Sequence, residues 1–317
     1  MSSTRYGLPY QGSKNSIALD ILRFLPSGNR LCDLCGGGGA ITHAALSSNT
    51  YKWNSFLYNE ISPLVCRAFD MAIHGQFKGE KRWISREDFF RLRDTDPYVA
   101  FCFSFGNNLL NYCYSRDIEP WKKAVHYARV LGDSSLFAAF GIHSDGSRRD
   151  ITTHLPEYRE KYNSWLKEIC KGDSSRYDSS AFPSLESYAR LQNLQHFQSL
   201  ERLESLERLE SLTITCGSYE SYSYLPGDVV YLDIPYEGTD CKSYNGFDHA
   251  AFYDWAISQP FQIFFSSYHL SSPHPFYLVW EQRKEVFVDE NHNVRTECIY
   301  SNKPYRTSLL PIEPTLF

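Results

Sequence analysis

The sequence lacks any hydrophobic run that approaches the roughly 18 apolar residues of a membrane-spanning helix. Its first residues, MSSTRYGLPYQGSK, also lack the apolar core of a secretory signal peptide. These two absences argue against a membrane protein and against a secreted one. We therefore expect a cytoplasmic protein.

The cysteines lack the spacing of a metal site. There are nine of them, and only Cys32 and Cys35 form a C-x-x-C pair, whereas a zinc site of this type needs a second pair. A redox motif is the alternative for this pair, but the glycines that follow it offer a better explanation. An odd number of cysteines without an export signal favours a reducing compartment. We predict no metal.

Positive charge is not in excess either. The net charge of −5 argues weakly against a nucleic-acid partner, although a single basic face would be enough to bind phosphates. What is present is ordinary for a globular protein: 42% hydrophobic and 22% charged residues in a chain of 317. That length allows one large domain or two of usual size.

The first part of the chain alternates between strand and helix patterns. Apolar residues recur at helical spacing from Ile17, and Pro26 ends that helix. A short strand, a glycine loop and a helix start follow in NRLCDLCGGGGAITHAAL. A second strand then runs to Tyr58, with an acid at Glu60. This order predicts an α/β doubly wound domain.

The character of the sequence changes between residues 78 and 198. Charges of both signs are mixed there with aromatic residues, which favours a helical insertion. Strands and helices alternate again after it, so residues 1–77 and 213–317 are expected to share one sheet. That sheet closes with an antiparallel hairpin, whose turn we place at Asn291 to Asn293.

Residues 199–212 contain a tandem repeat, in which the hexad SLERLE occurs twice. Apolar residues fall at every third position, whereas an α-helix has 3.6 residues per turn and a coiled coil about 3.5. The segment is therefore either a helix buried on several sides or a coil with three residues per turn, and we favour the coil. We interpret it as a spacer whose copy number sets the distance between a recognition region and the catalytic strand.

Four glycines follow the first strand and allow a ligand to approach the backbone closely. The dinucleotide signature G-x-G-x-x-G/A fails in all three frames, because its last position falls on Ile41, Thr42 or His43. The P-loop signature also fails, since no Gly-Lys-Ser/Thr follows. S-adenosylmethionine remains, with Glu60 placed to hold its ribose. The alternative is that the glycines only make a tight turn.

The stretch GDVVYLDIPY reads as a buried strand that ends on Asp233, Ile234, Pro235 and Tyr236. Side chains at the carboxyl end of a central strand face the ligand crevice. Asp233 and the Ile234 carbonyl can each accept a hydrogen of an exocyclic amine, and Tyr236 offers a ring for stacking, while Pro235 restricts the backbone. These groups fit the amino edge of a base, and they can stabilise charge that develops when the amine attacks a methyl sulfonium.

The motifs YQGSK, DLCGGGGA, NE, CGSY and DIPY occur in this order, with an insertion before the last two. Together they resemble the Dam-type, class α (D12) DNA N6-adenine methyltransferases over about residues 6–303. The resemblance implies a Rossmann-like sheet, S-adenosyl-L-methionine as methyl donor, and transfer to a flipped-out adenine. It also implies double-stranded DNA as partner, in a bacterium or a phage. A cognate restriction endonuclease stays open as a second partner.

The resemblance also assigns residues to roles. Asp233, Ile234, Pro235 and Tyr236 would form the catalytic tetrad. The residues expected to bind the cofactor, besides Asp233, are Tyr10, Lys14, Asp33, Cys35, Gly36, Gly37, Glu60, Ser218 and Tyr219. The residues expected to bind DNA lie in the insertion and are Asn107, Asn108, Tyr112, Arg116, Arg148 and Arg149.

One position departs from the family pattern, because Ile234 stands where the family has proline. Isoleucine keeps the main-chain carbonyl that the chemistry needs, and the added backbone freedom costs about 1 kcal/mol. We therefore expect an active enzyme. The alternatives are a DNA-binding relative that has lost catalysis, and a methyltransferase that acts on RNA or another amine.

Overall fold

The computed structural model describes residues 6–48, 52–143, 155–170, 209–238, 244, 246–270, 275–288 and 291–305. By its internal contacts the chain divides into two compact units. Unit 1 combines Met1–Gln76 with Phe197–Phe317, and unit 2 is Phe77–His196. The roles that the sequence suggests for the two parts, methyl transfer and DNA recognition, stay predictions.

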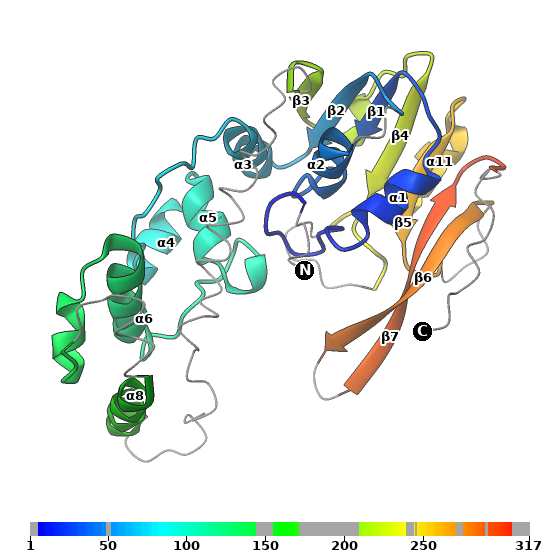
Figure 1. Cartoon of the computed structure of the whole chain (residues 1–317). Helices are drawn as coiled ribbons and strands as arrows, with labels where there is room; N and C mark the ends of the chain where they lie inside the picture. Colours follow the sequence, from blue (N-terminus) through cyan, green and yellow to red (C-terminus); the bar gives the residue numbers. More distant parts are fainter. Residues whose placement is uncertain are drawn as a thin grey trace. The chain divides into compact units, whose positions relative to one another are not determined.

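Unit 1 is built on one seven-stranded sheet with the order β3-β2-β1-β4-β5-β7-β6 (Figure 1). The strands are β1 (Arg30–Asp33), β2 (Ser55–Glu60), β3 (Leu212–Cys216), β4 (Asp228–Asp233), β5 (Ile263–Ser267), β6 (Tyr277–Val288) and β7 (Asn291–Ser301). The first five are parallel, and β7 joins β5 antiparallel. This is a Rossmann-like sheet with an antiparallel end, and both halves of the chain contribute to it, as the sequence predicted.

The closing hairpin is longer than the other strands. Figure 1 shows β6 and β7 running on together past the ends of their neighbours. The predicted turn at Asn291 to Asn293 is wrong, because Asn291 pairs with Val288 and Asn293 pairs with Val286. Both asparagines therefore lie within β7. The polar Asn-His-Asn run suggested a turn, but strand pairing between the two chain segments extends through it.

The helices of unit 1 are α1 (Ala18–Phe24), α2 (Ala40–Ser47), α3 (Pro63–Ile73) and α11 (His249–Ser258). Alternation along the strands sends neighbouring residues to opposite faces of the sheet. Val230, Leu232 and Ile234 pack with α11 in one apolar cluster. Tyr231 and Asp233 consequently face the other side of β4.

Unit 2 is helical, as expected for the insertion. Its helices are α4 (Arg86–Leu92), α5 (Pro97–Phe103), α6 (Glu119–His126) and α8 (Leu155–Cys170). Three short helical segments accompany them: the 3₁₀ helices η1 (Phe105–Asn107) and η3 (Ser135–Phe140), and the π-helix η2 (Tyr127–Leu131). A core forms around the buried Trp121, whose ring lies 5.6 Å from Phe137 and 5.0 Å from Tyr162.

Among the described residues, no helix combines the length and the apolar character that crossing a bilayer requires. The hexad repeat falls largely on residues 199–208, which lie outside the described part of the chain. Its last residue, Leu212, opens β3.

Candidate active site

The glycine loop joins β1 to α2 and is fixed by residues at the end of β2. The Tyr58 hydroxyl donates to the Gly37 carbonyl at 2.6 Å, and the Gly37 amide donates to Glu60 Oε2 at 2.9 Å. A side chain at Gly36 would meet the Tyr58 ring at 2.3 Å, and one at Gly39 would meet the Phe69 ring at 2.2 Å. Glycine is therefore required here by close packing as well as by turn geometry.

Asp33 ends β1 and is almost fully buried, with 1% of its surface exposed. Thr42 Oγ1 donates to its Oδ2 at 2.8 Å, while Oδ1 is buried without a hydrogen-bond partner among the described residues. Burial raises the pKa of this carboxyl to about 7, and the charge of Asp233 adds to the rise. An orphaned carboxylate oxygen in such a place fits a cationic ligand such as an ammonium group.

Glu60 lies at the end of β2, and its carboxylate is held from several sides. Oε1 accepts from the Ser62 amide and from the Tyr244 hydroxyl, each at 2.9 Å. The Tyr10 hydroxyl in turn donates to the Tyr244 hydroxyl at 2.9 Å. Burial raises the pKa of Glu60, although these hydrogen bonds oppose the rise. Because Glu60 already accepts from a hydroxyl, its chemistry fits a ribose.

The other predicted cofactor residues lie near this loop. Cys35 packs against the apolar cluster of α11, and burial raises its thiol pKa well above the usual value, which opposes the thiolate that redox chemistry needs. Cys32 and Cys35 are both free. The Ser218 hydroxyl caps η6 (Tyr219–Ser221), and the Tyr219 ring lies 4.8 Å from Trp255.

Asp233 ends β4 beside a lysine from the N-terminal segment. Lys14 Nζ lies 2.9 Å from Asp233 Oδ1 and 3.2 Å from Glu297 Oε1. The Tyr236 hydroxyl donates to Glu297 Oε1 and, at 3.5 Å, to Asp233 Oδ1. Burial raises the pKa of Asp233 to about 6, while Lys14 holds it down. Burial tends to lower the pKa of Lys14, but the two carboxylates outweigh it and raise that pKa.

Ile234 and Pro235 connect these groups to the fold. The Ile234 side chain continues the apolar face of β4 and is 2% exposed. The Pro235 carbonyl and His249 Nε2 form a hydrogen bond of 2.7 Å. The departure from proline is therefore accommodated, since the isoleucine side chain fills space in the core.

The structure thus brings most of the predicted unit 1 residues together at the carboxyl ends of β1, β2 and β4. Two members of the site escaped the sequence analysis. Glu297 stands directly before a buried apolar run in β7, and this position of an acid is its one signal in the sequence. Tyr244 follows β4 in a polar loop and carries no local signal.

The predicted DNA-binding residues belong to unit 2. Ser104 and Tyr112 pair across a short loop, where Asn107 has a φ of 56°. Asn108 Oδ1 accepts the Leu110 and Asn111 amides, so this oxygen stabilises the loop itself. Tyr112 is buried, and its hydroxyl donates to the Ile84 carbonyl. Arg148 and Arg149 lie outside the described residues.

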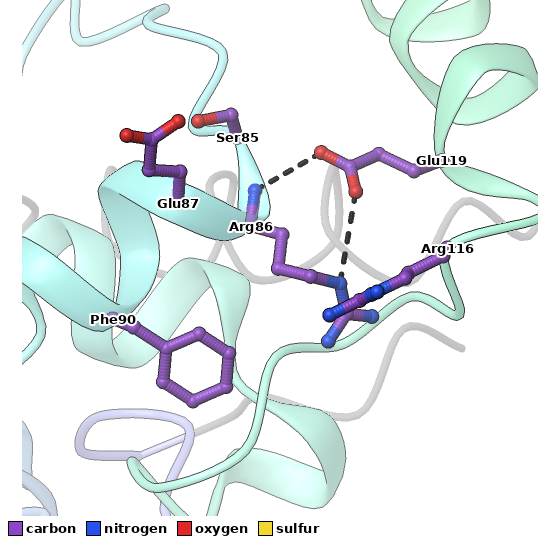
Figure 2. A pocket seen from close by; sticks show the side chains of 6 residues that line it. All are labelled: Ser85, Arg86, Glu87, Phe90, Arg116 and Glu119. Atoms are coloured by element: carbon purple, nitrogen blue, oxygen red, sulfur yellow. Dashed lines mark hydrogen bonds and ion pairs between the residues drawn. The ribbon is translucent and has the colours of Figure 1, made fainter.

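Arg116 is exposed and lines a pocket of about 560 Å³ in unit 2 (Figure 2). The other lining residues are Ser85, Arg86, Glu87, Phe90 and Glu119. The Arg86 amide donates to Glu119 Oε1 at 3.0 Å, and its Nε lies 3.8 Å from Oε2. Contacts with Glu119 thus fix the position of Arg86, whereas the Arg116 side chain is exposed to solvent.

A group of His269, Glu281 and Cys298 has the residue types of a metal site, with donor atoms within 4.8 Å of one another. However, His269 turns Nδ1 to Cys298 (3.7 Å) and Nε2 to Glu281 (3.5 Å). His269 thus contacts both neighbours, each through a different ring nitrogen.

In a comparison with known protein families, residues 10–301 match the model of the D12 class N6 adenine-specific DNA methyltransferases. A search of curated proteins found no match.

Proposed function

The chain belongs to the D12 class N6 adenine-specific DNA methyltransferases, and we propose that it transfers a methyl group from S-adenosylmethionine to the N6 amine of an adenine flipped out of double-stranded DNA. The observation that carries the proposal is the placement of Asp233 and Tyr236 at the carboxyl end of β4, beside the buried Asp33 on β1.

The donor would lie between the glycine loop and the carboxyl ends of β1 and β2. Asp33 Oδ1 would accept its ammonium group, and Glu60 would accept its ribose hydroxyls. Its sulfonium supplies an electrophilic methyl group. Ser218 and Tyr219 follow β3 and would lie beside its adenine ring, and the edge-on contact of Tyr219 with Trp255 would hold the tyrosine ring in place.

The acceptor amine would be held by Asp233 and by the Ile234 carbonyl. Two hydrogen-bond acceptors draw the amine hydrogens to one side and expose the nitrogen lone pair for attack. Tyr236 would stack on the base. The Asp233 carboxylate would stabilise the positive charge that develops on the amine nitrogen as the nitrogen takes the methyl group and the donor sulfur keeps the C–S electron pair. The proton that the nitrogen then loses would pass to this carboxylate or to water.

The test is expression in a host without DNA methylation, followed by mapping of N6-methyladenine across the genome. We expect methylation at one recurring sequence, and its loss in Asp233→Ala. Asp254→Ala is the matched control, because this aspartate is exposed on α11 and distant in sequence from the tetrad. Methyl groups found only in RNA, or wild-type protein that binds DNA without methylating it, would refute the proposal.

We propose separately that unit 2 contacts DNA. Among the residues predicted to bind DNA, Arg116 is exposed and can be tested by mutation. Arg116→Ala should weaken DNA binding severalfold and reduce by about one the slope of log affinity against log salt concentration. Lys78→Ala, which removes a cation elsewhere in unit 2, is the control. An unchanged slope in the Arg116 variant would remove this residue from the interface.

A further inference from the structure

The candidate active site contains an acid that the tetrad does not include. Glu297 lies on β7, directly before Cys298, which pairs with Ser267 at the end of β5. Asp233 pairs with Ser266 on the other side of β5. The two acids therefore reach the same edge of the sheet from strands on either side of β5, and Glu297 is 7% exposed.

Two groups connect Glu297 to Asp233. Lys14 Nζ lies within ion-pair distance of both carboxylates, at 3.2 and 2.9 Å. The Tyr236 hydroxyl donates to Glu297 Oε1 and lies 3.5 Å from Asp233 Oδ1. Lys14 Nζ also lies 4.5 Å from the centre of the Tyr236 ring. The four side chains thus form a closed ring of contacts.

We infer that Glu297 is a positioning residue for methyl transfer, which fixes Tyr236 and Lys14 so that the Asp233 carboxylate and the Tyr236 ring meet the target base in one orientation. This inference rests on the proposed function. The contacts of Asp233 with Lys14 and Tyr236 both use Oδ1, and Oδ2 would be the oxygen that accepts from the amine. Removal of Glu297 would take from the Tyr236 hydroxyl and from the Lys14 ammonium a carboxylate that both of them contact.

A purely structural role would have a different signature. A buried acid that only neutralises Lys14 would affect folding and donor binding when it is changed, because an unpaired buried charge destabilises the fold. A positioning residue should instead affect turnover at saturating substrate, since misplacement of reacting groups raises the barrier itself.

The experiment uses Glu297→Gln, which keeps the size and an acceptor oxygen but removes the charge. We expect kcat on DNA to fall about 10- to 100-fold, with KM for DNA, the Kd for S-adenosylmethionine and Tm nearly unchanged. Glu281→Gln is the control, because Glu281 lies opposite Cys298 on β6 and is exposed. Its kcat should stay within about twofold of wild type.

A double-mutant cycle with Tyr236→Phe gives the second readout. Tyr236→Phe keeps the ring and removes the hydroxyl that Glu297 binds. If Glu297 acts through that hydroxyl, the double variant is hardly slower than the slower single variant. Three outcomes would overturn the inference while the wild type remains an active methylase. The losses in kcat of the two single variants could multiply in the double variant, kcat of Glu297→Gln could be normal, or Glu297→Gln could change only Tm and the Kd for S-adenosylmethionine. A wild type that methylates no DNA would overturn the proposed function and this inference together.

Discussion

Two aspartates lie on neighbouring strands of the sheet, Asp33 on β1 and Asp233 on β4, and they differ in the partners of their carboxylates. Asp233 has a cation from the chain itself, Lys14 at 2.9 Å. Asp33 has none among the described residues, and one of its oxygens is buried without a partner. This difference indicates which ligand each carboxylate binds. Asp33 has no cation beside it and fits a cationic ligand, whereas the charge of Asp233 is balanced by Lys14, so that Asp233 fits a neutral amine.

The strongest test of this comparison is removal of the paired acid. Asp233→Asn should lower kcat on DNA by at least about 10²-fold, because an acceptor that stabilises charge in the transition state is lost. Binding of S-adenosylmethionine should change little, in contrast to the sequence-based expectation that Asp233 also binds the cofactor, and isothermal titration can check this. A weakened donor affinity of the same size would mean that the two acids serve one ligand.

Removal of the orphaned acid should act on the other ligand. Asp33→Asn is expected to weaken donor binding about 10- to 100-fold, the effect of losing a charged hydrogen bond. The same change should stabilise the ligand-free protein. The folded-state pKa of Asp33 is raised to about 7 from 3.8, so its burial costs stability increasingly as pH rises from about 4 to 7.

Melting curves of the ligand-free protein can check the second part. The Tm of Asp33→Asn should exceed that of the wild type above pH 7, and this gain should shrink to nothing near pH 4. A constant difference across that range would indicate that Asp33 is already neutral or already paired in the wild type.

The pH dependence separates the two acids without mutation. Both must be ionised to act, and burial raises the pKa of Asp33 to about 7 and that of Asp233 to about 6. Donor affinity should therefore fall below about pH 7, while kcat/KM for DNA at saturating donor should fall only below about pH 6, by tenfold per unit at its steepest. If donor affinity and the reaction rate fell over the same pH range, the two aspartates would not have separate roles.

The smallest effect is expected from Ile234→Pro, which restores the family residue. Proline removes backbone freedom worth about 1 kcal/mol in the unfolded chain. It also replaces an isoleucine side chain that is 2% exposed, whose burial contributes about 1.5–3 kcal/mol, with a proline ring that keeps part of this apolar area. These terms nearly cancel, so kcat and Tm should change little. A large gain in kcat would show that the isoleucine limits the reaction.

The sequence could predict those parts of the site that depend on local order. Asp33, Glu60 and Asp233 each end a strand, and parallel strands bring such ends to one edge. Glu297 was missed because its position depends on the antiparallel register of β7 against β5, which joins residues 30 and more apart. Tyr244 was missed because only the tertiary fold brings its hydroxyl to Glu60.

The turn of the closing hairpin shows the same limit. Asn291 and Asn293 have the composition of a turn, yet both are paired in β7 with residues of β6. Local propensity for turns is weak beside the gain from continued strand pairing. In unit 2, the sequence predicts DNA contacts for Asn108 and Tyr112, and their hydrogen bonds shown here stabilise the loop and the core.

The most direct measurement is a pair of assays on Asp33→Asn and Asp233→Asn: titration with S-adenosylmethionine, and transfer of labelled methyl groups to adenine in DNA at saturating donor. We predict that Asp33→Asn loses donor affinity and recovers most of its transfer once the donor is saturating. Asp233→Asn should bind the donor normally and transfer almost nothing. If both variants lose the same step, the division between a cation site and an amine site is wrong.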